Sequence, residues 1–175
     1  MPRRRDVWRR GELLARRTLH RTWARVGEQP RVPTFGMRKT AHVFGAVSLE
    51  EKPRFVHQFA PRFCGATFLD FLKLLVRRLR RKIFLILDNG PCHNLEEEEW
   101  REWIAANRHR IELFRLPLYS PELNPIEGVW KTTKRTTTHN RFFRTTTARD
   151  AALTSTFERF NASPATIAGH VARFL

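Results

Sequence analysis

A short apolar run that ends on an acid constrains this chain more than any other feature of its sequence. Residues 83–87 read Ile-Phe-Leu-Ile-Leu, and Asp88 follows them directly, ahead of an Asn-Gly-Pro turn. Five consecutive apolar residues bounded by turn residues are typical of a strand that is buried on both faces at the centre of a sheet. Open α/β sheets place their sites at the carboxyl ends of such strands. The run therefore predicts an α/β fold with Asp88 at a candidate site.

The rest of the chain fits this pattern with alternating strand and helix signals. Strands are expected at 40–49, 54–60, 82–88 and 111–117, and helices at 67–81, 95–110, from Pro125 onward, and over 146–160 and 163–174. Residues 1–39 are polar and rich in arginine and turn residues, and no strand is expected there. The order of elements indicates one α/β domain with its strands and helices interleaved.

Charge restricts the function classes. Lys and Arg number 33 against 17 acids, which gives the 175-residue chain a net charge of +16. Such an excess favours a polyanionic partner, nucleic acid before membrane, although a solubilising surface would also explain it. The two cysteines form no metal-binding or disulfide pattern, and no apolar run approaches the roughly 18 residues of a membrane span. A cytoplasmic protein without a membrane partner is expected.

A second carboxylate stands out at the start of a later helix. Asn124 is placed as its N-cap and Pro125 at its first helical position, so Glu127 falls in the first turn. Lys131 and Lys134 follow one and two turns later. A carboxylate followed by two ammonium groups suits a divalent metal beside a phosphate backbone. Taken alone, Glu127 is equally well explained by the helix dipole and by a pair with Lys131.

Two stretches carry a family resemblance when they are taken together. "LILDNGPCH" (85–93) and "LPLYSPELNPIEGVWKTTK" (116–134) resemble the catalytic domain of mariner-type DDE transposases, in particular their bacterial insertion-sequence branch. "RTWARVGEQPRVP" (21–33) is similar to the segment that follows the first catalytic Asp in that family. The resemblance implies a ribonuclease-H-like mixed sheet flanked by helices. It also implies a metal-dependent endonuclease that cleaves DNA and transfers strands during transposition.

The resemblance further implies roles for individual residues and partners. Asp88 would be the second acid of the catalytic triad, bridging two Mg²⁺ or Mn²⁺ ions, and Glu127 would be the third acid, holding one of them. Double-stranded DNA, as transposon ends and target, would be the partner in the bacterial nucleoid, and the resemblance leaves room for a homodimer. The residues expected to contact DNA are Lys131, Lys134, Arg135, Arg77, Arg78 and Arg81, and those expected to support the site are Asn89, His93 and Asn124.

The chain departs from the family pattern at the first acid. Where family members commonly read Asp-Glu, this chain reads Gly11-Glu12, and Asp6 is the only upstream aspartate, so the first acid falls to Asp6 or Glu12. Because an Arg-rich strand would bury unpaired charge, we expect the first central strand to be missing or degraded. The expected organisation is a degenerate Arg-rich N-terminus (1–20), a DDE core (21–145) and C-terminal helices (146–175). This organisation suggests the C-terminal part of a transposase, in a truncated and inactive copy.

Two other functions remain open at this point. The first is a basic DNA-binding module without catalysis, and the second is a ribonuclease-H-like nuclease that acts on RNA hybrids. A third carboxylate close to Asp88 and Glu127 would favour the enzyme, whereas a pair of acids without a third would favour the inactive copy.

Overall fold

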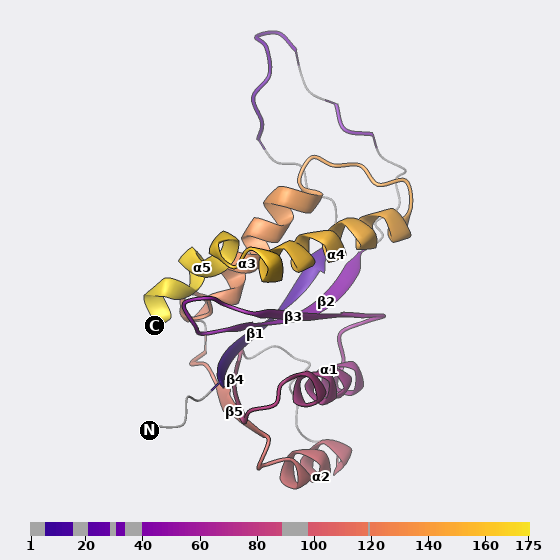
Figure 1. Ribbon diagram of the computed structural model, residues 1–175. Coiled ribbons are helices and arrows are strands. Elements are labelled where there is room, and N and C mark those ends of the chain that lie inside the picture. Colours follow the sequence, from indigo (N-terminus) through magenta and orange to yellow (C-terminus); the bar gives the residue numbers. More distant parts are fainter. Residues whose placement is uncertain (1–5, 16–20, 29–30, 34–39, 89–97, 119) are drawn as a thin grey trace.

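A five-stranded sheet forms the middle layer of the molecule, with helices on both of its faces (Figure 1). The computed structural model describes residues 6–15, 21–28, 31–33, 40–88, 98–118 and 120–175. The strand order is β3-β2-β1-β4-β5. β1 pairs antiparallel with β2 and parallel with β4, so the sheet is mixed. The expected α/β architecture, a mixed sheet flanked by helices, is therefore confirmed.

The elements follow one another along the chain as strands, helices and short turns of helix. The strands are β1 (Asp6–Ala15), β2 (Ala41–Ser48), β3 (Phe55–Ala60), β4 (Ile83–Leu87) and β5 (Ile111–Arg115). The α-helices are α1 (Gly65–Arg78), α2 (Glu98–Ala106), α3 (Ile126–Thr133), α4 (Thr146–Ala162) and α5 (Ala165–Val171). The shorter helical segments are η2 (Pro121–Leu123), η3 (Lys134–Thr138) and η4 (Ala172–Phe174).

The prediction that the first central strand is missing or degraded is wrong. β1 lies in the middle of the sheet, inside the Arg-rich segment that was expected to be degenerate and without strands. Trp8 and Leu13 are both fully buried, Trp8 in the core beneath one face of the sheet and Leu13 in the core beneath the other. A few apolar residues on opposite faces are thus enough to anchor the strand, and its backbone pairs on both sides.

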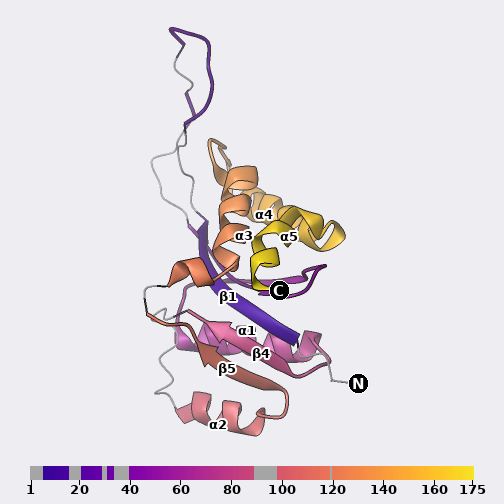
Figure 2. The ribbon, with the colours of Figure 1, turned by 90° about the vertical axis from the view of Figure 1, so that its left-hand side faces the viewer.

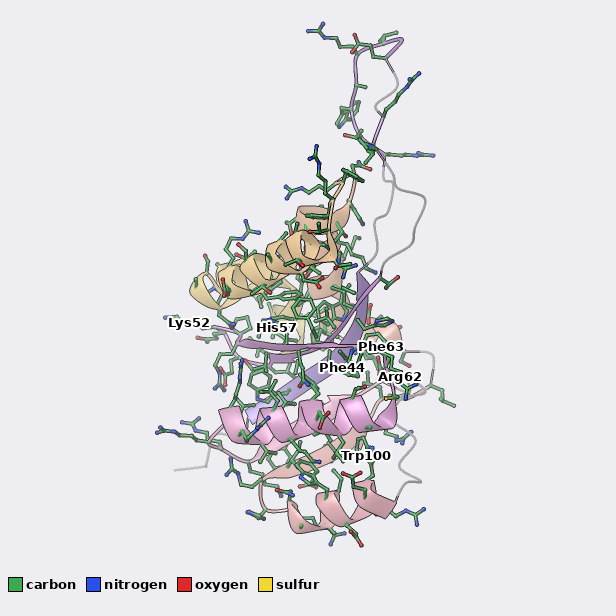
Figure 3. The ribbon with its side chains drawn as sticks, turned by 90° about the vertical axis from the view of Figure 1, so that its right-hand side faces the viewer. Phe44, Lys52, His57, Arg62, Phe63 and Trp100 are labelled. Atoms are coloured by element: carbon green, nitrogen blue, oxygen red, sulfur yellow. The ribbon has the colours of Figure 1, made fainter. Side chains whose placement is uncertain are left out.

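Two apolar cores lie on opposite faces of the sheet. In the first, Phe44 of β2 packs against Phe68 and Phe71 of α1, and Trp100 of α2 packs on Phe68. Figure 3 shows Phe44 between the sheet and α1, and Trp100 between α1 and α2. The second core lies between the sheet and α3, α4 and α5, and its largest side chains are Phe55, Trp130, Phe157 and Phe160. Trp100 and Trp130 are both almost completely buried in these cores.

Coverage of the sheet is less complete over β4 and β5 than the sequence suggested. Ile83, Leu85 and Leu87 are fully buried against the first core, but the alternate residues of β4 are only half-buried. Phe84 on this second face stacks on Phe114 of β5, whose side chain is 44% exposed. The prediction that β4 is buried on both faces is therefore correct for one face only.

Two further details correct or complete the sequence analysis. Pro125, not Asn124, is the N-cap of α3, and Asn124 contributes its backbone carbonyl to the Glu127 N–H at 3.2 Å. Residues 21–28 extend away from the sheet and helices at the top of Figure 1, with Trp23 almost fully exposed. Within the described ranges, no helix is long and apolar enough to cross a membrane.

Candidate functional site

Asp88 lies at the carboxyl edge of the sheet, immediately after β4. The backbone N–H of Leu116, just past β5, donates to the carbonyl of Leu87 at 2.8 Å, so the two parallel strands end together beside Asp88. In Figure 2, β4 and β5 both point to the left of the view, and the start of α3 lies on the same side. The half-buried Asp88 thus occupies the position that its place after an apolar run predicted.

Glu127 reaches this edge because α3 lies unusually close to the sheet. Gly11 of β1 and Gly45 of β2 pair directly in the antiparallel register. A Cβ on Gly45 would overlap Trp130 Cη2, and a Cβ on Gly11 would lie 3.0 Å from Trp130 Nε1. The Trp130 indole therefore rests on a pair of glycines. This close approach holds the first turn of α3, and Glu127 with it, against the end of β1.

Asp88 and Glu127 are close enough to influence each other electrostatically. The pKa of Glu127 is raised, first by loss of hydration and next by the negative charge of Asp88, while Lys134 acts in the opposite direction. Glu127 is still exposed to solvent, so an incoming ligand can approach the carboxyl group on which the charge of Asp88 acts. Two carboxylates that repel each other at an open edge form a suitable site for a cation.

Position 11 forms the third corner of this site. An ideal Cβ on Gly11 would lie 3.6 Å from Glu127 Oε1. The parallel register of β1 and β4 ends with the pair of Arg9 and Ile86, and the same register continued by two residues would place Gly11 level with Asp88. Trp130 Nε1 beside Gly11 is buried, and no hydrogen-bond acceptor reaches it within the described part of the chain. A carboxylate at position 11 would face both other acids and this unpaired donor.

Neither residue proposed for the first acid occupies that corner. Asp6 begins β1 and pairs with Ile83, at the opposite end of β4 from Asp88, so the structure does not bring these two acids together. Glu12 follows Gly11 and pairs with Phe44, and its side chain lies outside what the structure describes. Side chains alternate between the two faces of a strand, so positions 11 and 13 lie on the same face. Leu13 belongs to the core beneath α3, and position 11 therefore faces α3 and Glu127.

The basic residues of α3 and of η3, which continues it, divide into two groups around the helix axis. Lys134 is the cation that acts on the pKa of Glu127. Lys131 and Arg135 instead act on His170 of α5, whose pKa is lowered mainly by burial and then by Arg135, Arg173 and Lys131. His170 also packs on Gly128 and lies 2.8 Å from Thr132 Oγ1, which ties α5 to the helix that carries Glu127.

The helix changes its hydrogen-bonding pattern at Lys134, directly after α3. Lys134–Thr138 forms a π-helical turn, in which the N–H of His139 donates to the carbonyl of Lys134 at 2.8 Å. Such turns are frequent at functional sites because they reorient the side chains that follow. The sequence analysis contained no signal for this turn, for the glycine pair under Trp130 or for the role of His170.

The remaining predicted residues fall into two groups. Asn89 and His93 lie outside the described residues. Arg77 and Arg78 end α1, and Arg81 lies just before β4, so all three lie at the opposite end of β4 from Asp88. The six residues predicted to contact DNA therefore do not form one surface.

The fold and the acidic edge define a class of protein. The mixed five-stranded sheet flanked by helices is the fold of the ribonuclease-H-like catalytic cores of transposases and integrases. The Mos1 mariner transposase has this fold in its strand transfer complex, with a TM-score of 0.62 at 13% identity over 95% of this chain and 50% of Mos1. Its paired end complex with Mn gives a TM-score of 0.60 at 12% identity over 96% and 52%.

A retroviral protein shares the fold as well. The catalytic core domain of BIV integrase matches 90% of this chain and 84% of its own, with a TM-score of 0.56 at 14% identity. Residues 12–148 match the family model described as the DDE superfamily endonuclease. The chain therefore belongs to the DDE superfamily of endonucleases.

A curated relative places the chain in the insertion-sequence branch. It is 31% identical over 121 residues to the insertion element IS630 uncharacterized 39 kDa protein of Shigella sonnei. The match covers 67% of this chain and 34% of the relative, so the chain spans about a third of that protein's length.

Proposed function

We propose that this chain is the catalytic-domain portion of an insertion-sequence transposase that binds duplex DNA but neither cleaves it nor transfers its strands. The observation that carries the proposal is the glycine at the third corner of the acidic site. A Cβ at position 11 would lie 3.6 Å from Glu127 Oε1, and the register of β1 with β4 runs toward Asp88, yet Gly11 contributes no carboxylate. Two-metal phosphoryl transfer needs a cluster of carboxylates to neutralise and space both ions.

Asp88 and Glu127 are the residues that would hold a divalent metal, Mg²⁺ or Mn²⁺. Their oxygen ligands suit these ions, and the raised pKa of Glu127 reflects a local excess of negative charge that a cation would relieve. A bound ion would supply positive charge to a phosphoryl oxygen. Within the described ranges, no group of three or more His, Cys, Asp or Glu residues is arranged to hold a metal. The pair therefore fits one ion and lacks the ligand that a second ion would share.

The cations of α3 support the DNA-binding part of the proposal. Lys131 and Arg135 are exposed on the helix that carries Glu127, and Lys134 acts directly on the Glu127 carboxyl group. Phosphates approaching Asp88 and Glu127 would meet Lys134 beside the carboxyl group, and Lys131 and Arg135 on the side toward His170 would contact phosphates further along the duplex. The net charge of +16 adds a long-range attraction for any duplex.

The test is a plasmid-nicking assay of the purified chain with Mg²⁺ and with Mn²⁺. We expect negligible nicking by the wild type, at the level of an Asp88→Asn control. The informative variant is Gly11→Asp combined with Ile126→Ala, since a Cβ at position 11 would lie 2.5 Å from Ile126 Cγ2 and needs that space. This double variant should bind Mn²⁺ more tightly than the wild type in a titration followed by electron paramagnetic resonance.

DNA nicking by the wild type would contradict the proposal, and further variants would identify the first acid. Nicking by the wild type that Asp88→Asn abolishes would contradict the proposal and would mean that Glu12 or another acid completes the triad. If Glu12→Gln then lost the activity while Gly11→Ala kept it, Glu12 would be the first acid. Failure of the wild type to bind any duplex would remove the DNA-binding half of the proposal.

A further inference from the structure

A second cluster of cations lies at the end of the sheet that is remote from Asp88. It consists of Arg77 and Arg78 at the end of α1, Arg80 and Arg81 before β4, and Arg108 between α2 and β5, and we call it the distal basic patch. All five side chains are exposed. The N–H of Ile83 donates to the carbonyl of Arg110 at 2.8 Å, which brings the segment after α2 next to the start of β4. In Figure 2 these turns lie to the right of the view, opposite the start of α3.

These arginines are not needed to complete the end of α1. Basic residues in the last turn of a helix commonly serve its dipole and its free carbonyl groups. Here Arg110 does this work, because its guanidinium donates to the carbonyls of Val76 at 3.0 Å and Leu79 at 2.6 Å. The N–H of Leu79 also bonds to the carbonyl of Leu75 at 2.9 Å. The end of α1 is therefore capped without the patch arginines, whose side chains are exposed.

Four of the five patch arginines have no carboxylate paired with them among the described residues. Lys82 forms an ion pair with Glu112 at 2.9 Å, so these two charges cancel each other. In the part of the chain that the structure describes, Arg77, Arg78, Arg80 and Arg108 form no ion pair with a carboxylate. At least four guanidinium groups thus stand together without counter-charges, and guanidinium is the side-chain group best shaped for phosphate.

We propose that the distal basic patch binds the phosphate backbone of a second DNA duplex, separate from the duplex at Asp88 and Glu127. The two surfaces are separated by the length of β4, roughly 17 Å for a rise of about 3.3 Å per residue. That separation exceeds the Debye length of about 8 Å at physiological ionic strength, so the two surfaces attract phosphates independently. The chain then bridges two duplexes. This inference rests on the proposed DNA binding at α3 and adds a second surface to it.

The experiment tests bridging between two short duplexes of unrelated sequence, one biotinylated and one fluorescent. The intact chain is mixed with both, and fluorescent duplex captured on streptavidin is measured. The wild type should capture it. The variant Arg77→Gln, Arg78→Gln, Arg80→Gln should still bind one duplex but should lose at least about nine-tenths of the captured fluorescence. Its salt slope for binding single duplexes should fall by no more than about three units, at roughly 0.9 per phosphate contact.

Two variants with the same loss of charge complete the design. Lys52→Gln, Arg141→Gln, Arg144→Gln removes three exposed cations elsewhere and should still bridge. Lys131→Gln, Lys134→Gln, Arg135→Gln removes the α3 cations and should also lose bridging. Capture by the patch variant equal to that of the wild type would overturn the inference, and it would indicate bridging through a protein dimer. A wild type that binds duplex but never bridges would also overturn it, while leaving the proposed function intact.

Discussion

At the scale of single residues, the glycine pair under Trp130 shows how packing and the acidic site share one position. Gly11 and Gly45 let the indole lie directly on the sheet, and this contact sets the height of α3 and therefore of Glu127. Restoring an acid at position 11 must displace Ile126 and bring a Cβ close to the indole nitrogen. Gly11 is thus a packing residue as well as the position that faces Glu127, and an acid placed there would disturb the packing.

Gly45→Ala tests this packing directly. The added methyl group would overlap the Trp130 ring, so we expect a loss of about 1–3 kcal/mol in the free energy of unfolding. Gly169→Ala in α5 is the matched control, since its Cβ meets nothing within 4 Å. A helical glycine replaced by alanine should gain about 0.5–1 kcal/mol. Urea denaturation of both variants provides the comparison, and equal stabilities would show that the indole does not rest on the sheet.

His57 gives the fold a predictable response to acid. It lies between β3 and α4, with its ring centroid 4.5 Å from that of Phe157, and Figure 3 shows it on the α4 side of the sheet. Burial, and next the charge of Arg78, lower the pKa of His57 from 6.5 to about 4. The native state therefore holds a neutral imidazole over a pH range in which the unfolded chain holds a protonated one.

The sign of the effect follows from this difference in bound protons. Between pH 6.5 and about 4 the unfolded chain binds more protons at His57, so stability falls as the pH falls through that window. The expected loss is about 3 kcal/mol, at about 1.4 kcal/mol per pKa unit. His57→Phe should remove this part of the slope in urea denaturation at a series of pH values. The pKa of His170 is also lowered, so a slope of stability against pH with the same sign should remain in this variant. A variant as acid-sensitive as the wild type would contradict the assignment.

At the scale of elements, edge strand β3 is held by a side chain that takes the place of a neighbouring strand. The N–H of Phe55 donates to Asn161 Oδ1 at 2.8 Å, and Asn161 Nδ2 donates to the carbonyl of Phe55 at 2.9 Å. Asn161 lies in the last turn of α4, so this amide joins the helix to the outer edge of the sheet. An amide matches both backbone groups at once, and few other side chains can do so.

Asn161→Ala should therefore destabilise the fold and loosen this edge. Two hydrogen bonds to partly buried backbone groups are lost, which predicts a cost of about 2 kcal/mol. Asn161→Asp keeps the acceptor and loses the donor, so a smaller cost is expected. Hydrogen exchange of the Phe55 amide should accelerate in the alanine variant and change less in the aspartate variant. Unchanged protection of that amide in both variants would rule out the role given to Asn161.

The elements also show which parts of the fold can be predicted from the sequence. β2, β3, β4 and β5 were expected within a few residues of their observed bounds, because their apolar residues follow a simple strand period or form a short continuous run. β1 was missed because its buried residues change faces between Trp8 and Leu13, with glycine and arginine between them. A central strand that is covered on both faces need not show any single period.

The candidate site likewise has parts that can be predicted from the sequence and a part that cannot. Asp88 and Glu127 could be predicted because a strand end and a helix start are local signals that meet at one edge of an α/β sheet. The third corner could not, since it depends on the register between β1 and β4 and on the distance of α3 from the sheet. Sequence spacing pointed to Gly11-Glu12 but could not decide which of the two positions faces Glu127.

At the scale of the whole molecule, the charge distribution predicts how the protein binds DNA. The net charge of +16 is concentrated in part at two ends of the sheet, on α3 and η3 at one end and in the distal basic patch at the other. Contacts to phosphates carry no sequence information. Binding should therefore be governed by ionic strength and should discriminate little between sequences.

The magnitude can be set from the number of phosphate contacts. Lys131, Lys134 and Arg135 would make about three contacts with one duplex, which predicts a slope near −3 in log K against log salt and a loss of affinity of about 40-fold between about 50 and 200 mM salt. A fluorescence anisotropy titration at several salt concentrations, with two duplexes of unrelated sequence, measures both properties. A slope near zero, or a preference of more than about tenfold for one of the two duplexes, would mean that base contacts rather than the two cationic ends of the sheet hold the DNA.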